Sequence, residues 1–276
     1  MFRKIISSIF IYLLLFSNIL AKYEGYPPDM QRIFERGKLI VAMTKMDMPP
    51  FYYIDDNKEF SGLDVELAKK IAEELGVEVE FNRESETFNA VADKVFKGEA
   101  DIAISKLSRT SNRAAKVRFS KPYISFRQAL LINRLGLARQ VSEVNEESIT
   151  EFLKNCDSKI GVIRASSYYH FANILFPKAE IIEFDSWDRI VDAVLDGEIL
   201  LGYRDEMEIK KIIRGYPSAA LRLMSVILKD EKDDIAMAVA WENTHFLSWV
   251  DIFLENQRLD ISAESLLDKY SDIFDK

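Results

Sequence analysis

Short apolar runs alternate with amphipathic segments along the chain from residue 37 onward. The run Leu39–Met43 predicts a buried strand, and the apolar residues Leu67, Ile71 and Leu75, four positions apart, predict a helix after it. Such alternation is typical of α/β proteins. Further strands are predicted at 77–81, 101–105, 159–163, 180–184 and 199–203, and further helices at 88–96, 166–176, 187–195 and from 205.

The start of the first predicted helix carries a capping signal. Ser61 and Asp64 have the spacing of a capping box, in which two side chains bond the free N–H groups of a helix start. Pro49-Pro50 upstream predicts a loop, and Gly76 predicts the end of the helix.

Two stretches share the pattern D-x-V-x-x-G-E, namely Asp93–Glu99 and Asp192–Glu198. Each precedes an apolar strand, so the sequence predicts two lobes with a similar helix–glycine–strand unit. The first of these strands ends at Ser105 and the second at Arg204-Asp205. Ligands of open α/β sheets bind beyond the carboxyl ends of the strands, and we therefore expect both ends to face a shared cleft.

Two segments are predicted to cross between the lobes as a hinge, Phe126–Arg134 and Ile227–Ala236. The tail from Trp241 then returns to the first lobe, with one helix whose apolar face includes Phe246 and Phe253. We expect residues 22–126 to form the first part of lobe 1, 127–235 to form lobe 2, and 236–276 to complete lobe 1 with C-terminal helices.

Residues 1–21 have the composition of a secretory signal peptide. Arg3 and Lys4 precede a mostly apolar stretch that ends at Ala21, after which cleavage is expected. The alternative is an uncleaved membrane anchor, although the stretch is shorter than most spans and is interrupted by polar residues. The prediction is a periplasmic protein.

Charge and composition exclude several classes. The net charge of −8 would become −10 without Arg3 and Lys4, which disfavours nucleic acid as a partner. Cys156 is the single cysteine, so no intrachain disulfide can form, and the 48% of hydrophobic residues must supply the core. Two histidines and one cysteine disfavour a zinc site, and we expect no metal and no cofactor.

The run from Ser105 to Arg113 suits the capture of a small carboxylate. An apolar strand leads into hydroxyl residues, a helix start and an arginine within a few positions. Free N–H groups at a helix start favour an anion, and a guanidinium binds a carboxylate with two parallel hydrogen bonds. The alternative is a surface arginine paired with a nearby acid.

Together with other landmarks, this run resembles the polar-amino-acid family of periplasmic solute-binding proteins, the receptors of ABC importers. The landmarks are Gly37–Val41, Pro49-Pro50-Phe51, Gly62–Lys69, Gly98–Asp101 and Val117–Tyr123 with Arg113 before it. The resemblance implies an α/β, two-lobed periplasmic-binding-protein fold (type II-like), in which each lobe is a central sheet flanked by helices and the lobes are joined by a two-stranded hinge.

The resemblance also implies the roles of individual residues. Arg113 would bind the α-carboxylate of an amino acid and Asp205 its α-ammonium, although Asp205 could also simply cap the following helix. Ser108 and Ser105 would lie in the wall of the first lobe, and the turn at Ser166-Ser167 would add N–H donors from the second lobe. Phe51 and Phe88 match positions where aromatic rings line the pocket, or they belong to the core.

The chain departs from the family pattern at three positions. Met48 replaces an aromatic residue, Lys106 a small residue and Ala165 a glycine. Lys106, with Lys45 and Arg109 nearby and Asp47 opposing them, is open to two interpretations. These residues favour an acidic side chain on the ligand, or they form internal ion pairs.

The leading prediction is a monomeric receptor that closes on an amino acid and delivers it to a membrane permease, without catalysis. One alternative is an enzyme that resembles cyclohexadienyl dehydratase, for which Glu206 or His170 would be the general acid. Another is a ligand-sensing subunit of a membrane signalling partner.

Overall fold

The computed structural model describes residues 23–141, 145, 149, 152–153, 155–215 and 221–274. The predicted signal peptide lies outside these residues. Within them, no helix combines the length and the apolar character that a bilayer span requires.

The main sheet has eight strands in the order β4-β1-β5-β10-β6-β9-β7-β8, and β2 and β3 form a separate hairpin. Strand β1 pairs in parallel with β4 and β5, and β7 pairs in parallel with β8 and β9, whereas β10 is antiparallel to both β5 and β6. The strands are β1 Lys38–Thr44, β2 Tyr53–Ile54, β3 Phe60–Ser61, β4 Glu78–Ser85, β5 Ile102–Ala103, β6 Val117–Asn133, β7 Lys159–Ile163, β8 Glu180–Phe184, β9 Leu201–Asp205 and β10 Leu223–Ala240.

Helices cover both halves of this sheet, as the alternating pattern predicts, so the α/β expectation is confirmed. The helices are α2 Pro28–Arg36, α3 Leu63–Leu75, α4 Phe88–Phe96, α5 Ser111–Ala114, α6 Arg134–Ala138, α8 Ser167–Leu175, α9 Trp187–Asp196, α10 Glu206–Gly215, α11 Thr244–Gln257, α12 Ala263–Lys269 and α13 Ser271–Phe274.

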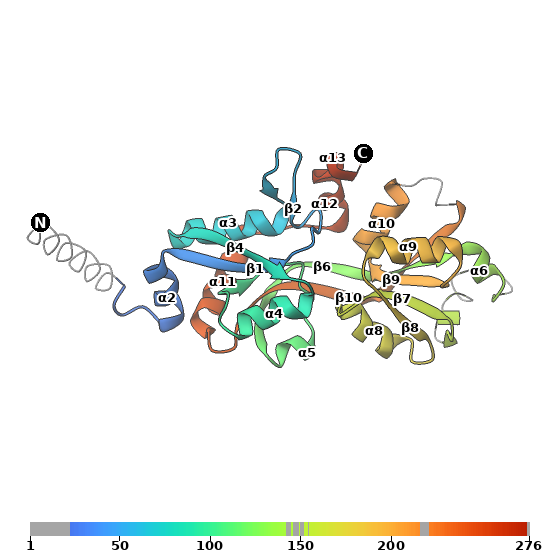
Figure 1. The fold of residues 1–276 in the computed structure, drawn as a ribbon, viewed down its shortest axis with the longest axis horizontal. Helices are drawn as coiled ribbons and strands as arrows, with labels where there is room; N and C mark the ends of the chain where they lie inside the picture. The colour runs from blue at the N-terminus through green and yellow to red at the C-terminus, as the bar shows by residue number, and fades with distance from the viewer. Residues whose placement is uncertain are drawn as a thin grey trace, which may run out of the picture.

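The molecule is elongated, with one cluster of helices at each end of the sheet (Figure 1). We call the half with β4, β1 and β5 lobe 1; α2 to α5 and α11 to α13 belong to it. The half with β9, β7 and β8 is lobe 2, together with α6 and α8 to α10. Strands β6 and β10 run through both halves and connect them.

The pairing of β6 with β10 is interrupted midway. Ile227 pairs with Ala129 and Lys232 with Arg127, so four residues of β10 bulge out opposite Gln128. The Gln128 side chain is buried and its Nε2 donates to the Lys232 carbonyl at 2.9 Å. The predicted hinge segment Ile227–Ala236 falls within β10, and Phe126–Arg134 falls within β6 except for Arg134, which begins α6.

Lobe 1 has its main core between the sheet and helices α3 and α11. Helix α3 contributes Leu67 and Ile71, and α11 contributes Phe246 and Phe253, all fully buried or nearly so. Lobe 2 has one apolar cluster on each face of its sheet, under α9 and under α8. The helical faces that the sequence predicts are therefore the faces that pack against the sheet.

The predicted capping box at the start of α3 is wrong. The N-cap is Gly62, without a side-chain hydrogen bond, and the Ser61 hydroxyl donates to Asp55 Oδ2 instead, at 3.0 Å. Gly62 has φ +120°, and a Cβ at this position would lie 2.4 Å from the Phe51 carbonyl oxygen. The close approach of the loop around Phe51 therefore requires glycine and displaces the helix start by one residue.

Replacing Gly62 tests this arrangement. We expect Gly62→Ala to lower the free energy of unfolding by more than about 3 kcal/mol, because the methyl group meets backbone atoms in a conformation that alanine avoids. Gly76→Ala is the matched control: Gly76 also has a positive φ, but open space surrounds its Cβ position. It should cost about 1 kcal/mol. If urea unfolding shows that the two variants lose the same free energy of unfolding, the close contact at Gly62 is contradicted.

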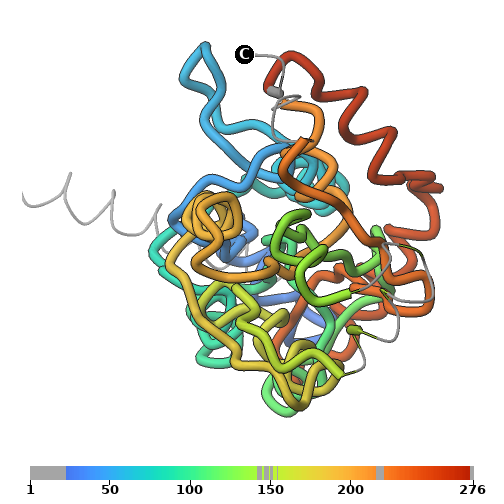
Figure 2. The backbone as a smooth tube through the Cα atoms, turned by 90° about the vertical axis from the view of Figure 1, so that its right-hand side faces the viewer, coloured from blue at the N-terminus to red at the C-terminus, as the bar shows by residue number. Residues whose placement is uncertain are grey.

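The β2–β3 hairpin and the C-terminal helices project on the same side of the molecule in both views (Figures 1 and 2). Tyr53 and Asp55 of the hairpin and Asp272 of α13 line one shallow hollow there. Helix α12 also packs against α10, so the C-terminal segment touches lobe 2 as well as lobe 1.

Candidate ligand-binding cleft

The loop between β5 and α5 supplies the lobe 1 wall of the cleft. Lys106 in this loop has φ +45°, a left-handed conformation that is rare outside glycine. Asp64, at the start of α3, holds it there: its Oδ2 accepts from the Lys106 backbone N–H at 2.7 Å and its Oδ1 from the Tyr123 hydroxyl at 2.8 Å. Burial raises the pKa of Asp64 to about 7.

Arg113 lies in the first turn of α5, and its guanidinium is buried. Nη1 donates to the Ser108 carbonyl at 2.9 Å and Nε to Asn89 Oδ1 at 3.0 Å. These two bonds orient the guanidinium and leave Nη2 without a hydrogen bond to the described residues. Burial lowers the pKa of Arg113 to about 10, an effect that the charge of Asp233 opposes. The group therefore stays cationic at neutral pH.

The turn before α8 supplies the facing wall from lobe 2. Ala165 has φ +53°, the left-handed conformation of a glycine, although it carries a side chain. Ser166 is the N-cap of α8 and leaves the helix N–H groups free of a side-chain partner. The hydroxyls of Ser167 and Ser108 share a hydrogen bond of 2.8 Å, so the two walls touch in this structure.

A buried cluster of one lysine and two carboxylates also joins the lobes. Lys106 Nζ donates to Asp205 Oδ2 at 2.9 Å and to Glu208 Oε1 at 2.8 Å. Asp205 ends β9, and its Oδ1 caps α10 by accepting from the Glu208 N–H at 3.1 Å. Burial acts to raise the pKa of Glu208, but the charges of Lys106, Lys211 and Arg204 hold it below its ordinary value.

A third buried carboxylate, Asp233 of β10, lies at the hinge side of the cleft. Its Oδ2 accepts from the Ser108 hydroxyl at 3.0 Å, and its Oδ1 makes no hydrogen bond of normal geometry with the described residues. Burial, followed by the charge of Asp205, raises the pKa of Asp233 to about 7, while the Ser108 and Tyr168 hydroxyls partly offset this.

These groups surround one small cavity between the lobes. Its volume is about 20 Å³, roughly the space of one water molecule. A pocket for a bound small molecule usually measures about 300–1,000 Å³. The cleft is therefore nearly filled by the protein's own side chains. The lining residues are Phe88, Lys106, Ser108, Arg113, Ser166, Ser167, Tyr168, Arg204, Asp205, Asp233 and Ile235.

Seven of the nine predicted site residues line this cavity; Phe51 and Ser105 do not. Phe51 packs edge-on against Phe126, with their ring centroids 6.0 Å apart. The Ser105 hydroxyl accepts from the Thr44 N–H at 3.1 Å and donates to the Tyr52 hydroxyl at 3.0 Å. Both residues support the lobe 1 wall from behind.

The lysines and arginine that favoured an acidic ligand do not gather at the cavity. Lys45 pairs with Glu86 at 3.2 Å on the surface, Arg109 is exposed, and Asp47 pairs with Arg83 at 2.6 Å. Only Lys106 of that group is buried, in an internal ion pair.

Sequence reasoning missed Tyr168, Arg204, Asp233 and Ile235 as lining residues. Arg204 directly precedes the predicted Asp205, and Tyr168 directly follows the predicted Ser167. Both lining residues are therefore neighbours of positions that the sequence predicts. Asp233 and Ile235 enter the cavity through the pairing of β10 with β6, for which the sequence holds no local signal.

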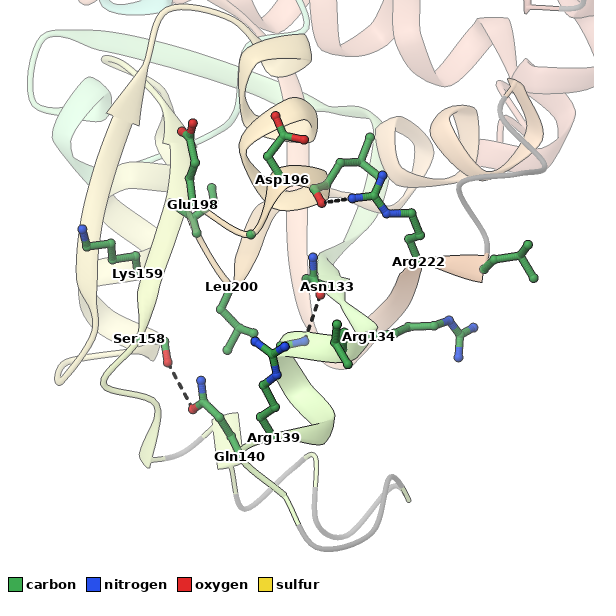
Figure 3. A pocket seen from close by; sticks show the side chains of 16 residues that line it. Asn133, Arg134, Arg139, Gln140, Ser158, Lys159, Asp196, Glu198, Leu200 and Arg222 are labelled. Carbon is green, nitrogen blue, oxygen red and sulfur yellow. Dashed lines mark hydrogen bonds between the residues drawn. The ribbon is translucent and has the colours of Figure 1, made fainter.

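A larger cavity, of about 890 Å³, lies at the outer end of lobe 2 near α6 (Figure 3). Asp196 and Glu198 stand on one side of it, and Arg134, Arg139 and Arg222 on another. This cavity lies away from Arg113 and Asp205. Across the described residues, no group of three or more histidine, cysteine or acidic side chains is arranged to hold a metal ion.

The sequence from residue 40 to 273 matches the family model for bacterial extracellular solute-binding proteins, family 3. The chain belongs to this family. A solved structure with the same fold is the amino acid ABC transporter substrate-binding protein AbpA of Streptococcus pneumoniae bound to L-arginine, 25% identical with a TM-score of 0.68. The match covers 87% of this chain and 96% of that one. The two-lobed fold expected from the sequence is therefore confirmed for this solute-binding protein.

Two further relatives bear on enzyme activity. An ancestral amino acid-binding protein described as a precursor of cyclohexadienyl dehydratase is 26% identical, with a TM-score of 0.66 and coverage of 87% and 98%. The membrane-bound lytic murein transglycosylase F of Idiomarina loihiensis is 30% identical over 169 residues, 61% of this chain and 34% of the relative. The chain thus spans about a third of the length of that curated relative.

The elevated pKa of Asp233 predicts a pH dependence of stability. The ordinary aspartate pKa is 3.8, so between about pH 4 and pH 7 the folded protein holds a proton on Asp233 that the unfolded chain has lost. The contribution of this group to the free energy of unfolding therefore falls as the pH rises through this range. Asp233→Asn cannot ionise and should escape the loss.

We expect wild type and Asp233→Asn to melt at similar temperatures near pH 4, and the variant to melt several degrees higher near pH 8. Asp64 has a similar pKa but is present in both proteins, so the comparison isolates Asp233. A difference in melting temperature that is the same at both pH values would contradict the assignment.

Proposed function

We propose that this protein captures an amino acid between its lobes and delivers it to the permease of an ABC importer. The observation that carries the proposal is the pair of buried, opposite charges on facing walls. Arg113 lies in lobe 1 and Asp205 in lobe 2, and both line one cavity together with serine hydroxyls. A zwitterion needs such a pair, because a buried charge without a partner is costly.

The α-carboxylate would bind Nη2 of Arg113, the Ser108 hydroxyl and the N–H groups at the start of α8. A helix N-terminus favours an anion through its unpaired N–H groups and its dipole. The α-ammonium would bind Asp205. Because these groups come from both lobes, the ligand satisfies all of them only when the cleft is closed. Ligand binding would therefore shift the hinge equilibrium toward the closed shape.

The family supports a secreted binding protein, and the arginine-bound relative supports the amino-acid class and the importer. Catalysis is not part of the proposal. The expected general acids do not face the cavity: Glu206 accepts from the Arg127 backbone N–H and from Lys210, and His170 is exposed on α8.

A thermal-shift screen tests the proposal. We expect one class of amino acid to raise the melting temperature by mass action, by several degrees at a hundredfold excess over the dissociation constant, with no product formed. The panel includes the twenty amino acids, dicarboxylates and cyclohexadienyl acids. Stabilisation by a cyclohexadienyl acid alone, with release of an aromatic product, would overturn the proposal in favour of a dehydratase.

A further inference from the structure

Lys106 occupies the position that an amino acid's ammonium would take. Its Nζ is 2.9 Å from the carboxylate of Asp205, which is the proposed partner of the ligand's α-ammonium, and 2.8 Å from Glu208. A lysine Nζ and an α-ammonium are the same chemical group, with three donors and one positive charge. The protein therefore presents Asp205 with an internal equivalent of its ligand.

The surroundings of Lys106 are built to hold a cation. The side chain is buried, with 5% of the residue exposed, and Nζ lies 5.0 Å from the ring centroid of Phe51 and 5.6 Å from that of Phe126. Aromatic faces attract a cation at such distances. The unusual left-handed backbone of Lys106, fixed by Asp64, directs the loop so that this contact forms.

The carboxylate half of the cleft holds a buried acid. Asp233 accepts from the hydroxyl of Ser108, one of the groups proposed to bind the ligand's carboxylate, and lines the same cavity as Arg113. With these side chains in place, only about 20 Å³ remains between the lobes. In this closed arrangement, the protein's own side chains fill the cleft.

We propose that Lys106 is an internal competitor for the ammonium subsite, which closes the empty cleft and must be displaced when an amino acid binds. This inference rests on the proposed function and adds to it a residue that sets affinity. The lysine crosses from lobe 1 to two carboxylates of lobe 2, so it links the lobes as a ligand would. Breaking a buried pair leaves uncompensated charges, which favours opening so that water reaches them.

Other contacts between the lobes are weaker candidates for this role. Arg214 and Asp268 form an ion pair of 2.9 Å, but both side chains are about half exposed or more. Exposed pairs contribute about 1 kcal/mol at most. Lys211 of α10 donates to the Pro49 carbonyl of lobe 1 at 3.0 Å. Within the proposed binding site, the Ser108–Ser167 hydroxyl bond also joins the lobes, but Lys106 supplies the charged contact there.

The test uses Lys106→Ser, which restores a small residue, and Lys106→Met, which removes the charge but keeps much of the bulk. Each protein is unfolded, dialysed and refolded to remove carried-over ligand, and circular dichroism checks that it has refolded. Lys116→Ser is the matched control, because Lys116 pairs with Asp93 on the surface of lobe 1, away from the cleft. Two quantities are measured, the radius of gyration by X-ray scattering and the dissociation constant for the amino acid that stabilises best.

We expect empty wild type and Lys116→Ser to be as compact as the ligand-saturated protein. Empty Lys106→Ser should be expanded and should contract on binding. Its dissociation constant should fall at least about tenfold, because the ligand no longer has to displace Lys106 from a mostly closed empty protein. Lys106→Met should be equally expanded when empty.

Two results would overturn the inference: an empty wild type as expanded as Lys106→Ser, or a serine variant that binds no more tightly than wild type. If no amino acid binds any of these proteins, the proposed function fails. In that case, the radius of gyration of the empty wild type and of its variants still tests the role of Lys106. This measurement requires no ligand.

Discussion

Arg113→Ala should weaken amino-acid binding at least about a hundredfold. The substitution removes the buried cation that faces the ligand's carboxylate, and a carboxylate buried without its partner costs about 3–5 kcal/mol. Titration calorimetry on the refolded protein measures the loss directly. Arg113→Lys should bind with intermediate affinity, because lysine keeps the charge but lacks the planar, two-pronged geometry of the guanidinium.

Two controls separate binding from folding. Arg109→Ala removes an exposed arginine from the loop before α5 and should leave the dissociation constant unchanged. Asn89→Ala removes the side chain that holds Arg113 Nε at 3.0 Å, and it should weaken binding only severalfold. If Arg113→Ala folds and binds as tightly as wild type, Arg113 is a structural residue that only orders the loop around Ser108.

Asp205→Asn should lower the free energy of unfolding by about 3 kcal/mol, because it breaks a buried ion pair and leaves Lys106 with one carboxylate instead of two. For a protein of this size the melting temperature should fall by roughly 6–12 °C. The same substitution should weaken amino-acid binding at least about tenfold, since the ligand's ammonium loses its anionic partner.

A double-variant cycle isolates the contribution of the ion pair. The double variant Lys106→Met/Asp205→Asn should be considerably more stable than the sum of the two single-variant losses predicts. In the double variant, neither residue of the pair remains as a buried charge without its partner. Urea unfolding of the four proteins gives the coupling free energy. Losses that add to within about 0.5 kcal/mol would show that the 2.9 Å contact contributes little in solution.

The sequence predicts the layered fold because each amphipathic segment has one face that must be buried. The apolar positions of α3, α9 and α11 recur at helical spacing, and those same positions pack against the sheet. The capping box fails because the contact of Gly62 with the Phe51 carbonyl decides where the helix begins. Phe51 lies earlier in the chain, outside the residues that form the capping signal.

The candidate site is predictable where it depends on the ends of strands. Arg113, Ser108 and Ser167 follow strands and Asp205 ends one, and all four residues meet at one cavity. Asp233 was not predictable in this way, because it enters through the register of β10 against β6. The pairing of Lys106 with Asp205 was not predictable either, because the two residues are 99 positions apart in the chain and belong to different lobes.

The crystal structure of the complex with the most stabilising amino acid is the most direct test of the central claim. We predict the α-carboxylate on Arg113 and the α-ammonium on Asp205, with Lys106 Nζ moved off that carboxylate. A ligand bound elsewhere, for example in the larger cavity near α6, or one whose ammonium makes no contact with Asp205, would contradict the account.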